Sequence, residues 1–213
     1  MRKSIIVYVI LAFSGYLFAN NAPSQSSKAG TILDAMSKKY AAIPSFNASF
    51  TYSTDGLKDS YKGEVTVKNK KFRLKLAGQE IFNNGQTVST FIKETNEVNV
   101  SNFDPAEEGI NPAKIYTIYK KGYKYAFIEE QKAGTKVYEV VELTPEKVNS
   151  QIAKLRITVD KKDKSVKSWR ITTKDGKKQS FKIDKFVALK GLSDTHFNFD
   201  KAKYPGVEVI DLR

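Results

Sequence analysis

Residues that could carry catalytic or metal chemistry are few in this sequence. It contains one histidine, His196, and no cysteine. Thiol catalysis and thiolate metal sites are therefore excluded, and a lone histidine has no second imidazole with which to share a metal ion. The neighbours Thr195 and Phe197 form no catalytic motif with it. We expect His196 to be structural or simply exposed.

Two acidic pairs, Glu107-Glu108 and Glu129-Glu130, are the other candidates for chemistry. Adjacent side chains on a strand point to opposite sides, whereas a glycosidase needs two carboxylates that face one bond. The sequence after residue 19 also lacks a P-loop, a G-x-G-x-x-G and a G-x-S-x-G motif. We therefore expect a protein that is not an enzyme and that uses no metal and no cofactor. An esterase or a glycosidase is the enzymatic alternative.

The N-terminus has the features of a cleaved secretory signal. Arg2 and Lys3 precede an apolar run over residues 5–18, and Ala19 precedes Asn20-Asn21. This run is shorter than the roughly 20 residues that a membrane-spanning helix needs. We predict a signal peptide over residues 1–19, a disordered leader over residues 20–28 and a single exported domain over residues 29–213.

The formal net charge of the chain is +13. Such a surface attracts anionic partners. For an exported protein, an acidic membrane face or an anionic envelope polymer is favoured over nucleic acid. The alternative is a lysine-rich surface that only keeps the protein in solution, because the lysines follow the strands and do not cluster with aromatic residues.

The periodicity of apolar residues predicts one helix and then many strands. Residues 29–40 place Ile32, Leu33, Met36 and Tyr40 on one stripe of a helix, which Ile43-Pro44 ends. From Ser45 the period changes to two. Strands are predicted over residues 46–52, 61–68, 72–76, 81–82, 87–92, 97–101, 123–130, 135–143, 154–160, 166–172 and 179–186, with a short last strand around Phe197 and Phe199 and a tail from Tyr204.

Residues 102–122 break this rhythm. Their turn residues are followed by a possible second helix with Ile115, Ile118 and Tyr119 on one side. Strands at short spacing favour a mainly β, antiparallel fold, and a sheet of this size curls. We therefore predict a curled sheet whose concave side is covered by the two helical segments. By composition alone, the 13 Phe and 11 Tyr residues favour the filled core of a β-sandwich over an open cavity.

Several segments, in their order and spacing, resemble a known family. The resemblance starts at the strand that begins at Ser45 and continues to the end of the chain. Its segments are residues 63–68, 71–74, 78–81, 84–88 and 97–98, then Pro112 with Ile115, then Phe197-x-Phe199 and Pro205-Gly206-Val207-x-Val209-x-Asp211. Together they are similar to the LolA family of periplasmic lipoprotein carriers.

The resemblance implies a fold, a site and partners. The fold is an incomplete β-barrel plugged by helices, and the activity is transport of lipoproteins from an inner-membrane ABC transporter to the outer membrane or a receptor there. It implies a periplasmic monomer that binds acyl chains and no nucleic acid. The implied lipid-binding residues are Phe72, Leu74, Leu76 and Phe91 on the sheet, Ile32, Leu33 and Met36 on the first helix, and Ile115, Ile118 and Tyr119 in a moving lid.

The sequence departs from the family pattern at two positions. Members commonly have an arginine and a proline after the strand of residues 63–68, where the arginine latches the lid, but this chain has Asn69-Lys70. Ser89 stands where a tryptophan is common. Two alternatives remain on the same scaffold: a carrier of another lipid, such as a glycolipid or a pigment lipid, and a periplasmic sensor domain that binds a protein partner.

Overall fold

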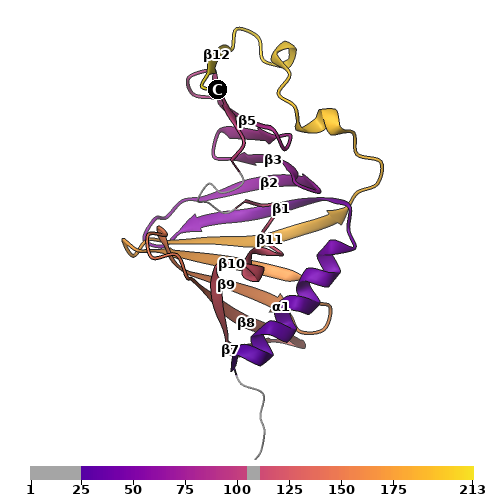
Figure 1. Ribbon diagram of the computed structural model, residues 1–213, viewed down its shortest axis with the longest axis vertical. Helices are drawn as coiled ribbons and strands as arrows, with labels where there is room; N and C mark the ends of the chain where they lie inside the picture. The colour runs from indigo at the N-terminus through magenta and orange to yellow at the C-terminus, as the bar shows by residue number, and fades with distance from the viewer. Residues whose placement is uncertain (1–24, 105–110) are drawn as a thin grey trace, which may run out of the picture.

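A computed structural model describes residues 25–104 and 111–213, and it contains one large sheet (Figure 1). Twelve strands form this sheet in the order β12-β6-β5-β4-β3-β2-β1-β11-β10-β9-β8-β7, and it does not close into a barrel. The elements are α1 (Gln25–Ala41), β1 (Ser45–Thr54), β2 (Ser60–Lys68), β3 (Lys71–Leu76), β4 (Gln79–Asn83), β5 (Thr87–Ile92), β6 (Glu97–Asn102), β7 (Tyr123–Ala133), β8 (Lys136–Pro145), β9 (Ile152–Asp160), β10 (Val166–Thr173), β11 (Lys178–Ala188) and β12 (Glu208–Asp211), with short 3-10 helices η1 (Ile118–Lys120), η2 (Asp194–Phe197) and η3 (Lys201–Lys203).

Neighbouring strands are antiparallel throughout the described sheet except at β12, which runs parallel to β6. The register shifts at Ser49/Phe50 in β1 and at Phe127/Glu129 in β7. Such bulges increase local twist, which helps a large sheet to curl. The prediction of a mainly β, incomplete barrel is confirmed.

The strand register places an apolar set of side chains on the inner face of the curve. Phe46 lies opposite Val67, which lies opposite Phe72. On the other half, Trp169 lies opposite Phe181 and Ile157. These positions and their neighbours belong to a single hydrophobic core. The alternation of apolar residues in the sequence therefore corresponds to one buried face.

Helix α1 covers the β7–β10 half of the inner face and crosses in front of these strands in Figure 1. Ile32, Leu33 and Met36 are 3%, 0% and 0% exposed and pack into the core. The helix ends before Pro44, whose ring disfavours helical backbone at Ile43.

The C-terminal segment covers part of the outer face. After β11 it passes over the β3–β6 half, seen in yellow in Figure 1, and ends as β12 beside β6. Phe82, Val98, Phe197 and Val207 are buried but lie outside the inner core. Asp194 in η2 forms ion pairs of 2.8 Å with the side chains of Lys68 and Lys71. The segment is therefore anchored by both apolar and charged contacts.

Three local predictions were wrong. Helix α1 starts at Gln25 instead of residue 29, so residues 25–28 are not a disordered leader; residues 1–24, with the expected signal peptide, lie outside the described part. The expected strand at Phe197 is 3-10 helix η2, because the Ser193 side chain accepts a hydrogen bond from Thr195 N and caps that turn. The expected second helix is a series of turns that ends in η1, and residues 105–110, with Glu107-Glu108, are not described.

Within residues 25–104 and 111–213, no helix has the length and hydropathy required to cross a bilayer.

Gly63 in β2 leaves the space that the Phe50 ring fills. A Cβ at residue 63 would lie 2.3 Å from Cζ of Phe50, which is 2% exposed. We predict that Gly63→Ala lowers the free energy of unfolding by about 1–3 kcal/mol, because the ring has to move within a packed core. Urea denaturation measures this change. In a Phe50→Leu background the same substitution should cost less, and an equal cost would contradict the contact.

Candidate functional site

The inner face is not buried to the same extent along the sheet. Under α1, the side chains of Leu143, Leu155 and Ile157 are fully buried. On β3 and β4, by contrast, Leu74 and Ile81 lie opposite each other and are only partly buried. Tyr52, Leu76, Phe181 and Ile183 continue this partly buried set. We call Tyr52, Leu74, Leu76, Ile81, Phe181 and Ile183 the open apolar patch.

The predicted sheet residues divide between the two faces. Phe72 is 8% exposed and is packed in the core, whereas Leu74 and Leu76 lie in the open apolar patch. Phe91 lies opposite Glu80, on the outer face, and its ring centroid is 4.5 Å from that of Tyr204 in the C-terminal segment. The assignment of Phe91 to the lipid-binding face is therefore wrong, because the register of β5 turns its side chain outward.

Residues 111–121 form the segment that we call the lid. Ile115 is 2% exposed and Tyr119 is 5% exposed, and Ile118 packs against the core. Tyr116, which was not predicted, stacks on Tyr40 at the end of α1 with ring centroids 3.6 Å apart. A helix with Ile115 and Tyr119 inward would have turned Tyr116 outward. The turn conformation brings all three side chains inward.

A hydrogen bond joins the lid to α1. The Tyr119 hydroxyl donates to Oδ1 of Asp34 at 2.6 Å. Burial of the phenol, together with the bond to Asp34, raises the pKa of Tyr119 to about 12. The hydroxyl therefore keeps the proton that this bond needs at neutral pH. This contact is a candidate for the latch that the sequence lacks at Asn69-Lys70.

Aromatic rings close the lid at the other end. The ring of Tyr116 also lies edge-on to Phe46 on β1, at 5.8 Å between centroids. The Tyr40 hydroxyl accepts a hydrogen bond from the backbone N–H of Val166 at 2.9 Å, which fixes the ring that Tyr116 covers. Burial and the neighbouring Tyr40 raise the pKa of Tyr116 well above its ordinary value.

Two surface pockets lie away from the open apolar patch. One lies between α1 and β7, beside Gly30, Asp34 and Tyr125. The other, of about 280 Å³, lies on the outer face beside Arg73 and His196. The expected hollow beneath Phe72, Leu74 and Leu76 is neither of these two, and Phe72 itself is covered by the protein's own side chains.

The single tryptophan, Trp169, lies on the inner face beside the open apolar patch. Its ring stacks on Phe181 with centroids 5.2 Å apart. The indole is 8% exposed, and its buried N–H has no hydrogen-bond acceptor among the described residues. Trp169 is therefore a natural fluorescent reporter for anything that enters this face.

The described residues contain no group of three or more His, Cys, Asp or Glu side chains that could hold a metal ion. His196 lines the outer pocket, and burial together with the positive charges of Arg73 and Lys75 lowers its pKa. The open apolar patch offers hydrocarbon and phenol groups to a ligand.

These features define a class: an open, curved antiparallel sheet with an apolar inner face, covered by one helix and a short lid. The chain belongs to the family of the outer membrane lipoprotein carrier protein LolA, whose model matches residues 22–177. No curated protein matches the chain at a significant level.

Two solved structures with TM-scores above 0.5 share the fold at low sequence identity. An uncharacterized conserved protein from Thermus thermophilus aligns with a TM-score of 0.59 and 12% identity, over 86% of this chain and 99% of that one. A DUF1329 family protein from Desulfovibrio piger aligns with a TM-score of 0.52 and 11% identity, over 83% and 98%. A LolA superfamily protein from Nitrosomonas europaea aligns with a TM-score of 0.46 and 15% identity, over 81% and 98%.

Removal of the Tyr119 hydroxyl should loosen the lid. We predict that Tyr119→Phe makes lid opening easier by about 1 kcal/mol, since the bond ends on an exposed, partly screened carboxylate. Hydrogen–deuterium exchange of residues 111–121 should then accelerate about fivefold.

Two comparisons test whether the effect belongs to this bond. Tyr61→Phe removes a hydroxyl from a tyrosine that is 43% exposed on β2 and should leave exchange of the lid unchanged. Tyr119→Phe combined with Asp34→Ala should open the lid no more than Tyr119→Phe alone, because both changes remove the same contact. Additive effects would contradict the proposed latch.

Proposed function

We propose that the protein carries the acyl chains of lipoproteins on its inner face, through the periplasm, to the outer membrane. The observation that carries this proposal is the open apolar patch, which belongs to the same core as the lid that the Tyr119–Asp34 hydrogen bond holds to α1. Membership of the LolA family supports the same conclusion. In this proposal residues 1–19 are the export signal, the donor is an inner-membrane ABC transporter and the carrier is a monomer.

The physical basis is the transfer of hydrocarbon out of water. Each methylene that leaves water contributes about 0.8 kcal/mol, so a few sheltered acyl segments give strong retention. Leu74 and Ile81 present such a surface without a charged neighbour facing them across β3 and β4. Because Phe72 is already covered, entry of a whole acyl chain requires the lid to move.

The packing of the core favours a helix α1 that stays in place and a lid that moves. Ile32, Leu33 and Met36 fill the space over β7–β10 and act as a permanent wall. The lid contributes fewer buried side chains than α1. The family resemblance implies that three lid residues, Ile115, Ile118 and Tyr119, contact the lipid. In the proposal their apolar contacts with the sheet are exchanged for contacts with the acyl chain, so opening exposes little apolar surface to water.

Apolar side chains recognise a chain and not a headgroup. The same patch therefore suits a glycolipid or a pigment lipid, and the cargo has to be identified by extraction. Mass spectrometry of lipid released from the purified protein distinguishes these cargoes. Protein that is reproducibly empty and takes up no acylated peptide would falsify the carrier proposal and favour a sensor of a protein partner.

A charge on the open apolar patch should block uptake. We predict that Leu74→Glu weakens binding of lipids with brominated acyl chains at least about tenfold, because a carboxylate would have to be desolvated beside hydrocarbon. Quenching of Trp169 fluorescence by bromine measures binding at the inner face. The brominated lipid is presented below its critical micelle concentration.

Val187→Glu is the matched control. It adds the same charge to β11, where Val187 is 39% exposed and points outward opposite Asn47. This variant should bind as the unchanged protein does, and both variants should remain folded by circular dichroism. Equal loss of quenching in the two variants would contradict a site on the inner face.

A further inference from the structure

Exposed lysines gather along one edge of the sheet. They lie at the end of α1, in the β2–β3 and β9–β10 connections, at the adjoining ends of β7 and β8, and after β11. This edge is on the right in Figure 1, where the β11 arrow ends and β1 begins. We call the following six residues the basic edge: Lys38, Lys70, Lys132, Lys136, Lys162 and Lys190.

Contacts between the connections make the edge continuous. The Lys39 side chain donates to the backbone oxygen of Asp163 at 2.7 Å, which joins the end of α1 to the β9–β10 turn. The Lys68 side chain donates to the backbone oxygen of Leu192 at 2.6 Å, which joins the β2–β3 turn to the segment after β11. Leu189 N donates to Ser45 O at 2.8 Å and links β11 to β1.

Acidic residues near this edge are already paired with other lysines. The pairs are Glu130 with Lys28 and Lys161, Glu139 with Lys164, Asp163 with Lys39, and Asp194 with Lys68 and Lys71. Hydrogen bonds from Lys68 and Lys71 lower the pKa of Asp194 to about 2. At neutral pH its carboxylate is therefore ionised and paired with these two lysines. Among the described residues, the six lysines of the basic edge form no ion pair. Their charge is available to an external partner.

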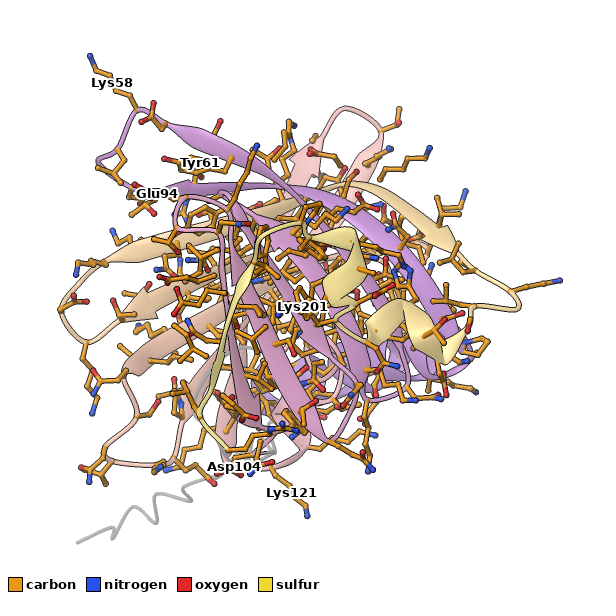
Figure 2. The ribbon with its side chains drawn as sticks, turned by 90° about the horizontal axis from the view of Figure 1, so that it is seen from above. Lys58, Tyr61, Glu94, Asp104, Lys121 and Lys201 are labelled. Atoms are coloured by element: carbon orange, nitrogen blue, oxygen red, sulfur yellow. The ribbon has the colours of Figure 1, made fainter. Side chains whose placement is uncertain are left out.

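The opposite edge differs in its charge balance. There the β1–β2, β5–β6, β8–β9 and β10–β11 connections carry equal numbers of lysines and acidic residues: Lys58, Lys93, Lys147, Lys174 and Lys177 beside Asp55, Asp59, Glu94, Glu146 and Asp175. Figure 2 shows Lys58 and Glu94 on the same side of the molecule. The connections of this edge are therefore balanced in charge, whereas the β2–β3 and β9–β10 connections of the basic edge carry an excess of lysine.

We propose that the basic edge docks the protein on the surface of an anionic lipid bilayer. The lysines stand at the ends of successive strands, which are about 4.8 Å apart, so they form a long arc that suits a flat anionic surface. Nucleic-acid sites commonly add aromatic side chains that stack on bases. Tyr61, the one aromatic residue among the strongly exposed apolar residues of the described chain, lies on the opposite edge.

Docking by this edge also places the lid next to the membrane. Tyr116 stacks on Tyr40, two residues after Lys38. The ring contact that closes the lid is therefore at the docked edge. This consequence rests on the proposed carrier function, because it supposes that acyl chains enter or leave past the lid; the docking itself does not depend on it.

Sedimentation with vesicles tests the docking. The vesicles contain equal parts of phosphatidylglycerol and phosphatidylcholine, with pure phosphatidylcholine vesicles for comparison. The unchanged protein should bind the anionic vesicles at low salt and release them as salt screens the charges. A variant with Lys132→Glu, Lys136→Glu and Lys162→Glu should bind at least about a hundredfold more weakly, at roughly fivefold for each lysine removed.

The control variant carries Lys58→Glu, Lys93→Glu and Lys178→Glu, which changes the net charge equally on the opposite edge. It should bind the anionic vesicles within about fivefold of the unchanged protein, since these lysines point away from the docked surface. An equal loss in both triple variants would overturn the proposal, because net charge alone would then explain binding. Tighter binding to soluble polyphosphate than to the vesicles would overturn the choice of a bilayer.

Quenching of Trp169 by brominated lipid separates the two proposals. The basic-edge variant should keep full quenching by lipid supplied without vesicles, because the open apolar patch is unchanged. If brominated lipid does not quench Trp169 in the unchanged protein, the carrier function is contradicted, but the result with vesicles still stands.

Discussion

The apolar face of the curved twelve-stranded sheet has to be shielded from water. Helix α1 and the lid, which lie on this face, provide the shielding. The sheet supplies the apolar side chains by simple alternation, but it does not close on itself. Helix α1 shields one half with Ile32, Leu33 and Met36, which are nearly or fully buried. The other half is shielded only in part, and the open apolar patch is what remains.

The two covering elements differ in how they are held. Helix α1 is fixed by many apolar contacts, which are not directional and persist through small movements. The lid has fewer buried apolar side chains than α1, and it is also held by directional contacts: the Tyr119–Asp34 hydrogen bond and the stacking of Tyr116 on Tyr40. Contacts of this kind are lost over a short displacement. The architecture therefore combines a stable wall with a cover that can move.

The outer face is used for stability and for charge. The C-terminal segment buries Phe82 and Val98 from outside, which fastens the β3–β6 half of the sheet independently of the inner core. Tyr204 donates a hydrogen bond to Glu80, and Arg73 binds the same carboxylate at 2.6 Å. Although burial acts to raise the pKa of Glu80, these partners outweigh it and hold it below its usual value. Glu80 and Arg73 thus pair on the outer face, away from the open apolar patch.

The sequence by itself determined the strands, the mainly β class, the curvature and the apolar inner face, because strand alternation is local and repeats every two residues. It also determined the family, through the order of its turns. It did not determine the face on which Phe91 lies, because that depends on a register set by pairing with β4. Nor did it determine the turn conformation that brings Tyr116 onto Tyr40, or the bond between Asp34 and Tyr119. Those contacts join residues far apart in the chain, and only the assembled tertiary structure decides which of them meet.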